Sequence, residues 1–135
     1  MIALGWCAQP ATAPKPTPAV TLSSAAPAAH VVLSLPGSQI QLSVNRIENA
    51  SEQAVGIHVV VHVCPAQGDA GFDLGLVTPY PIDRTGTFVL ELPSEAATKL
   101  KSCGDAASVD MTLVPIHETE ALREGTTIVA TVRPG

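Results

Sequence analysis

The sequence has few aromatic residues, few basic residues and no long hydrophobic run, and each shortage excludes a class of protein. Its 135 residues include one Trp, one Tyr and two Phe. A core must therefore be built from aliphatic, mostly β-branched residues, which favours sheet over helix. The formal net charge is -5 and the basic residues form no stripe, so nucleic acids and anionic membranes are not expected partners. No apolar run approaches the roughly 20 residues of a spanning helix.

Motifs of catalytic sites are also missing. The sequence contains no Gly-x-Ser-x-Gly nucleophile motif. Asp110 and Thr112 fall on the outward side of a predicted strand, where a polar surface is the expected role. Asp83 and Arg84 are adjacent and could pair, but such pairs are usually exposed and weak. We therefore expect no catalytic residue and no catalytic activity from this chain by itself.

Four histidines raise the question of a metal site. His58 and His62 share a strand face but lie roughly 13 Å apart, since each residue of a strand advances about 3.3 Å. His62 and Cys64 lie about 6.6 Å apart on that face and could share an ion by spacing alone. A cupredoxin-like copper site would need Cys, His and Met close together in a late loop. The C-terminal third offers only Cys103, Met111 and His117, which are spread over strands and loops. We expect no metal and no other cofactor in this domain.

The three cysteines leave one thiol unpaired. Cys64 ends a predicted strand and Cys103 lies in a turn between two others, so a disulfide between them is credible in an exported protein, periplasmic or extracellular. Cys7 would then remain free. The alternative is a cytosolic protein in which all three are reduced. The sequence leaves both interpretations open.

Short, alternating β-strand patterns follow one another from His30 to Arg133. In the clearest one, Ile57, Val59, Val61 and Val63 point one way and the intervening residues the other. Strands are predicted at residues 30–35, 39–47, 55–64, 72–78, 87–92, 108–114 and 126–133. A brief helix is predicted from Ser94, as its cap, to residue 100. Connections this short require mostly antiparallel pairing, and one-sided alternation favours two sheets packed face to face. The expected fold is an all-β, jelly-roll-like antiparallel sandwich of about seven strands.

The N-terminal stretch differs in composition. Residues 7–29 are rich in Pro, Ala, Ser and Thr and show no apolar period, which predicts an extended linker with polyproline character. We therefore divide the chain into residues 1–29, a linker or the remnant of an upstream domain or signal, and residues 30–135, the sandwich domain. Linkers of this kind connect two folded bodies, so a partner is expected before residue 1.

The proline-bounded loop at residues 79–86 is the candidate for contact with a partner. Tyr80 is the only tyrosine and stands between Pro79 and Pro81, which fix the backbone on both sides. A rigidly presented aromatic at a loop tip suits insertion into a partner. The alternative is that Tyr80 packs back on the sheet edge. With Asp83 and Arg84, these residues form the predicted partner or plug loop.

Three segments together resemble a known family. Residues 72–77 read Phe-Asp-Leu-Gly-Leu-Val, residues 86–92 read Gly-Thr-Phe-Val-Leu-Glu-Leu, and residues 108–115 read Ser-Val-Asp-Met-Thr-Leu-Val-Pro. This order is similar to the C-terminal β-domain of the tyrosinase and polyphenol oxidase family, which are type 3 copper enzymes. The resemblance covers about residues 40–133, and its most distinctive part is Val-Asp-Met-Thr-Leu-Val-Pro. Leu4, Gly5 and Trp6 also look like the Leu-Gly-Tyr that closes the catalytic domain in that family.

The resemblance implies a regulatory lid. In that family the C-terminal β-domain packs over the dicopper site, keeps the enzyme latent and places a side chain in the substrate entrance. Tyr80 with residues 79–85 would take that role here, and the two coppers would belong to a partner catalytic domain. The chain lacks the family's histidine-bearing helices, so no catalytic residue is carried over. The alternative function is an independent exported sandwich that binds a ligand or a protein partner.

Overall fold

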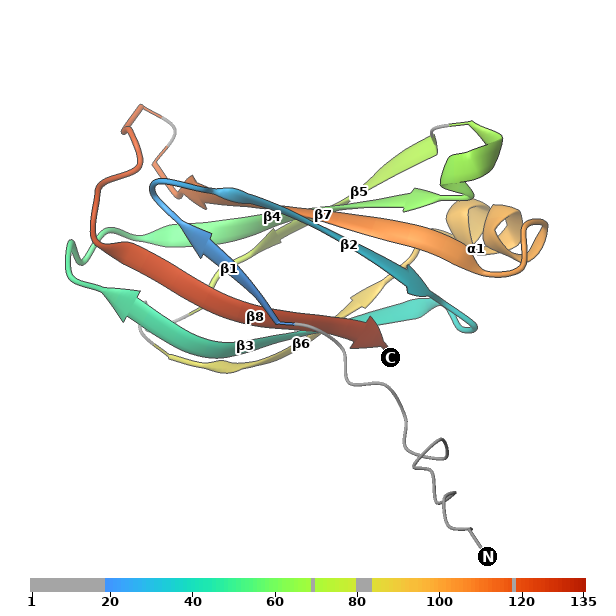
Figure 1. Ribbon diagram of the computed structural model, residues 1–135, viewed down its shortest axis with the longest axis horizontal. Coiled ribbons are helices and arrows are strands. Elements are labelled where there is room, and N and C mark those ends of the chain that lie inside the picture. The colour runs from blue at the N-terminus through green and yellow to red at the C-terminus, as the bar shows by residue number, and fades with distance from the viewer. Residues whose placement is uncertain (1–18, 69, 80–83, 118) are drawn as a thin grey trace, which may run out of the picture.

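The computed structural model describes residues 19–68, 70–79, 84–117 and 119–135. Within these residues, eight strands and one α-helix form the body shown in Figure 1. The strands are β1 (Ala19–Ser23), β2 (Ala28–Ser34), β3 (Gln39–Asn49), β4 (Val55–Val63), β5 (Ala70–Val77), β6 (Gly86–Glu91), β7 (Ala106–Pro115) and β8 (Thr126–Pro134). The helix is α1 (Ser94–Lys101), and a short 3-10 helix spans Pro65–Gln67.

The strands make two four-stranded sheets, in the orders β1-β8-β3-β6 and β2-β7-β4-β5. Every pair of neighbours is antiparallel, which confirms the predicted all-β sandwich. The eighth strand is β1, whose residues the composition assigned to the linker. Val20 and Leu22 alternate with polar residues there, and Leu22 is fully buried. Pairing with β8, from Ala19 opposite Thr131 onward, holds this short segment in the sheet.

The core is the aliphatic layer between the two sheets. All four inward residues predicted for β4 are buried, and they face the inward side chains of β3 and β8 across the sandwich. Both Phe72 and Phe88 are only partly buried at its margin. A β-branched and leucine-rich interior thus replaces the aromatic core that this composition could not supply.

The helix α1 closes one end of the sandwich. It buries Ala96 and Leu100, while Glu95 stands in its first turn and two lysines in its last, as the helix dipole favours. The predicted cap is wrong by one residue. Pro93 occupies the N-cap position and makes no side-chain capping hydrogen bond, and Ser94 is the first residue of the helix.

The opposite end of the sandwich holds the turn at residues 50–54, the end of β5, the start of β6, and residues 116, 117 and 119–125 between β7 and β8 (Figure 1). Gln53 ties two of these together and is only 2% exposed. Its amide nitrogen donates to the carbonyl of Ala121 at 2.9 Å, and its amide oxygen accepts the backbone N–H of Arg123 at 2.8 Å. The buried side chain of Gln53 therefore attaches the polar connection between β7 and β8 to the turn between β3 and β4.

Candidate functional site

The predicted plug loop leaves β5 of one sheet and enters β6 of the other. Pro79 is buried and Arg84 is exposed. Tyr80, Pro81 and Asp83 lie outside the described residues. The rigid presentation of Tyr80 and the pairing of Asp83 with Arg84 therefore stay predictions.

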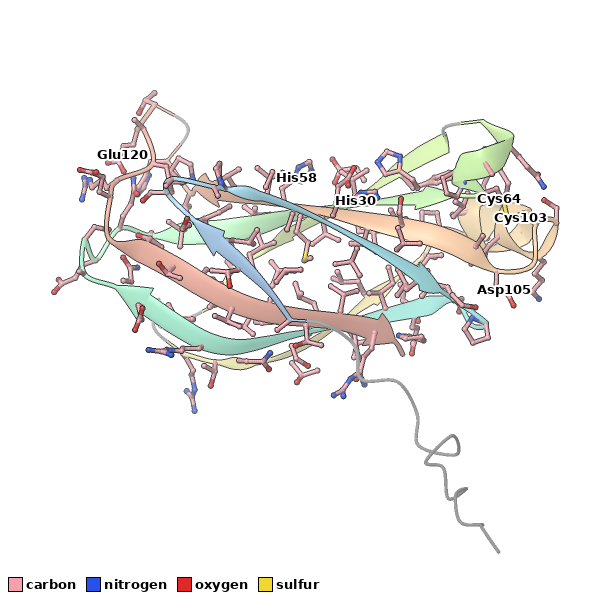
Figure 2. All side chains as sticks on the ribbon, viewed as in Figure 1. His30, His58, Cys64, Cys103, Asp105 and Glu120 are labelled. Atoms are coloured by element: carbon pink, nitrogen blue, oxygen red, sulfur yellow. A yellow bond between two sulfur atoms is a disulfide. The ribbon has the colours of Figure 1, made fainter. Side chains whose placement is uncertain are left out.

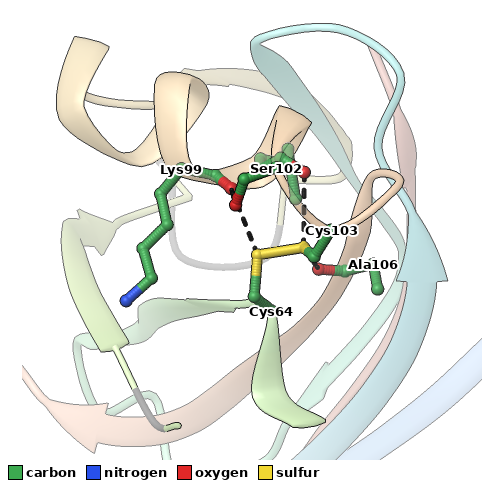
Figure 3. The surroundings of a disulfide bond; sticks show 6 residues. Cys64, Lys99, Ser102, Cys103 and Ala106 are labelled. Carbon is green, nitrogen blue, oxygen red and sulfur yellow. Dashed lines mark hydrogen bonds between the residues drawn. A yellow bond between two sulfur atoms is a disulfide. The ribbon is translucent and has the colours of Figure 1, made fainter. Parts of the chain in front are cut away.

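Cys64 and Cys103 form a disulfide, with their Cα atoms 5.7 Å apart (Figure 3). The bridge confirms the oxidised alternative and links the end of β4 to the turn after α1. The Cys64 sulfur lies 3.2 Å from the carbonyl oxygen of Lys99, as a close contact, because a disulfide sulfur carries no proton to donate. Cys64 is also excluded as a thiolate partner of His62 for a metal ion.

Three histidines and two aspartates gather on the outer face of the β2-β7-β4-β5 sheet. We call His30, His58, His62, Asp73 and Asp110 the histidine face. Two of its members, His30 and His58, are labelled in Figure 2 on the side of the sheet away from the core. This arrangement follows from alternation, since each residue points opposite to its buried neighbours on the same strand.

Asp110 accepts hydrogen bonds from histidines on both neighbouring strands. His30 Nδ1 on β2 donates to one carboxylate oxygen at 2.5 Å, and His62 Nε2 on β4 donates to the other at 2.8 Å. The bond from His30 is the main reason that the pKa of Asp110 lies below its ordinary value of 3.8. Partial burial opposes this shift, and the bond from His62 adds to it.

Asp73 on β5 makes a second, separate pair with His58. His58 Nε2 donates to one oxygen at 2.9 Å, and the Gly75 backbone N–H donates to the other at 2.7 Å. These two bonds, the histidine bond first, hold the pKa of Asp73 below its ordinary value. Both aspartates are thereby kept ionised, and all three histidines are held in one orientation.

Replacing Asp110 by asparagine is expected to lower stability at neutral pH and to have less effect in acid. A carboxyl whose pKa is depressed by folding contributes stability above its unfolded pKa and loses it as the pH falls through the folded value. Urea midpoints should therefore differ between wild type and Asp110→Asn at neutral pH and converge below the ordinary carboxyl pKa of 3.8. Thr112→Ala, on the same strand face, is the control and should show a difference that does not depend on pH. A constant difference for Asp110→Asn would contradict the interpretation.

An apolar hollow lies beside the histidine face, at the end of β5 from which residues 78–85 depart. It has a volume of about 420 Å³ and is lined by His58, Leu76, Val114, Pro115 and Ile116. Leu76 is 47% exposed. The other apolar lining residues are half-buried, and apolar side chains that gather while partly open to water are typical of contact surfaces.

Within the residues that the structure describes, no three His, Cys, Asp or Glu side chains are placed to hold a metal ion. Over the same residues, no helix has the length and apolar character needed to cross a bilayer.

The sequence analysis predicted none of the three histidine–aspartate pairs. Asp110 was predicted to be a plain surface residue, yet two histidines bind it. The His58–Asp73 pair had an available signal, because β4 and β5 form a hairpin and both residues fall on its outward side.

Neither a protein-family model nor a curated protein sequence matches this chain. The chain is similar to a solved structure of recombinantly expressed latent aurone synthase, a polyphenol oxidase, with 17% sequence identity and a TM-score of 0.40. The match covers 79% of this chain and 24% of that chain, so this chain spans about a quarter of the matched structure's length. A likeness at this level decides neither family nor function.

Proposed function

We propose that this chain is a noncatalytic β-sandwich that packs on the catalytic domain of a dicopper phenol oxidase and covers its substrate entrance. The observation that carries the proposal is the apolar hollow, which adjoins the connection bearing Tyr80. The three segments that resemble the tyrosinase and polyphenol oxidase C-terminal domain supply β5, β6 and β7. The hollow and the plug loop thus both arise from the part of the chain that carries the resemblance.

The chemistry of the hollow suits a protein surface better than a small substrate. Leu76, Val114 and Ile116 offer aliphatic contacts, and His58 is held at the rim by Asp73. Contact with a partner would remove these aliphatic groups from water, while the polar rim keeps the orientation specific. Copper in such an assembly belongs to the partner catalytic domain. The disulfide favours an oxidising, exported compartment for both.

Mixing the chain with a dicopper catalytic domain tests this function. The wild-type chain is expected to bind that domain and to inhibit phenol oxidation. Leu76→Glu should weaken binding by about tenfold or more, because burying a leucine contributes about 1.5–3 kcal/mol and a buried unpaired carboxylate opposes contact. Biolayer interferometry measures the binding, and oxygen consumption measures the inhibition.

Val89→Glu is the matched control, because Val89 is 53% exposed but lies on β6 of the other sheet. It should bind as the wild type does. Tyr80→Ala should bind and yet inhibit less, since only the plug is removed. Inhibition by Leu76→Glu equal to that of wild type would refute the hollow as the contact. Binding of the wild-type chain without inhibition would favour the independent binding module.

A further inference from the structure

One side of the sandwich is built from a stretch without charged residues. Residues 19–45 contain no Asp, Glu, Lys or Arg. They supply β1, β2 and the first part of β3. Both β1 and β2 are edge strands, one in each sheet, and in Figure 1 they diverge from a shared turn on the side nearer the viewer. Two uncharged sheet edges therefore lie on the same side of the molecule.

The backbone of β2 presents unused hydrogen-bonding groups on this side. The backbone carbonyl of Pro27 accepts a hydrogen bond from the N–H of Leu113, and the N–H of Leu35 donates to the backbone carbonyl of Asp105. Because hydrogen-bonded positions alternate along an antiparallel strand, the odd-numbered residues of β2 are the ones that bond to β7. By alternation, the N–H and C=O groups of the even-numbered residues face the open edge. These residues are Ala28, His30, Val32 and Ser34. Among the described strands, none pairs with β2 on that edge.

Edges of this kind are usually protected by lysine, proline or a bulge. The opposite edge strand of the same sheet, β5, follows that rule. It contains Asp73, a register shift against β4, and Gly75 at a φ of 98°. In contrast, β2 has no Asp, Glu, Lys or Arg, no proline and no register shift, and its Val32 is 74% exposed. The difference between the two edges indicates that β2 is kept available for pairing.

We propose that two copies of this chain associate through their β2 edges, in antiparallel register about a two-fold axis, to form one continuous eight-stranded sheet. A second copy suits this edge because the chain has a formal net charge of -5 and residues 19–45 carry none of it. Two copies meeting here avoid the repulsion that other approaches would bring. An antiparallel strand pair is also self-complementary, as a two-fold interface requires.

The strand's own length fixes the register. Full overlap of Ala28–Ser34 places Val31 of each copy at the axis and His30 of one copy opposite Val32 of the other. All outward N–H and C=O groups then find partners. On the inner side, Ala29 of one copy lies opposite Leu33 of the other, and both are only partly buried in the single chain. A small residue opposite a large one fills the margin of the joined cores.

Sedimentation velocity at rising concentration, up to millimolar, is expected to show a reversible dimer. Val32→Pro should weaken it at least tenfold, because proline removes one outward donor and leaves the bonds to β7 intact. Val89→Pro is the matched control. The N–H of Leu92 donates to the backbone carbonyl of Ser38, so the even-numbered residues of β6 bond to β3. The backbone N–H of the odd-numbered Val89 therefore points to the open edge of β6. The control should dimerise as the wild type does.

Amide hydrogen exchange shows whether the dimer forms through the β2 edge. The amides of His30 and Val32 should exchange more slowly in the dimer, while those of β6 should not change. If circular dichroism shows that Val32→Pro is unfolded, Val32→Lys replaces it, since a lysine on the edge opposes pairing and retains the donor. A monomer at every concentration would overturn the proposal. So would unweakened dimerisation of the folded Val32 variants, protection confined to another strand, or growth into larger oligomers. None of these outcomes depends on a dicopper partner.

Discussion

The double replacement Cys64→Ser with Cys103→Ser is expected to lower the free energy of unfolding by about 4 kcal/mol. The two residues are separated by 39 positions, so the bridge removes much of the freedom of the unfolded chain between them. In the folded chain, the bridge joins the end of β4 to the turn that follows α1. A loss of this size is a large part of the stability of a domain of this length.

Urea unfolding of the wild type and the double variant measures the effect. Cys7→Ser is the control, because it removes a thiol and keeps the bridge. Thiol titration of the unfolded, unreduced wild type should find one free thiol, since the chain has three cysteines and two are joined. Three titrated thiols, or equal midpoints for the wild type and the double variant, would show that the bridge is absent or adds no stability.

Replacing Gln53 by leucine is expected to cost about 3 kcal/mol. The leucine side chain has a similar size but cannot pair with the carbonyl of Ala121 or the N–H of Arg123. Both backbone groups would then lose a partner in a poorly hydrated position. The second effect is local, because the connection at residues 116–125 loses its attachment to the turn at residues 50–54 and should open more often.

Thermal unfolding measures the first effect and amide exchange the second. Gln67→Leu is the matched control, because Gln67 is exposed at the end of the 3-10 helix. This replacement should change the midpoint of thermal unfolding little. Exchange near Arg123 should become faster by a larger factor than exchange in β4, and this excess measures local opening beyond the global loss of stability. Equal midpoints for the Gln53 and Gln67 variants would mean that water replaces the lost partners.

Much of the fold could be predicted because strand patterns are local. The alternation in β4 specifies its buried side without any knowledge of its neighbours, and Val59 and Val61 are buried as expected. The pattern failed at β1, where five residues are too few to stand out beside a proline-rich stretch. Only the partner strand β8, more than a hundred residues later, makes Ala19–Ser23 a strand.

The site was harder to predict because its contacts are distant in sequence. Asp110 lies 80 residues from His30 and 48 from His62. They meet only because β7 lies between β2 and β4 in the sheet. The alternation of apolar and polar residues predicts the buried side of a strand, but it does not predict the order of the strands. Leu76 and Ile116 likewise come together through the pairing of β5 and β7 with β4. The Cys64–Cys103 pair could be named from the sequence because cysteine restricts the choice of partners.

The pairing of β1 with β8 has a mechanical consequence. Ala19 lies opposite Thr131, so the chain enters and leaves the domain through two neighbouring strands that run in opposite directions. A force pulling those two ends apart would break the hydrogen bonds between the strands one after another, as a zipper opens. Tethered between two larger bodies, this domain would yield at β1 first and keep its disulfide-linked end folded.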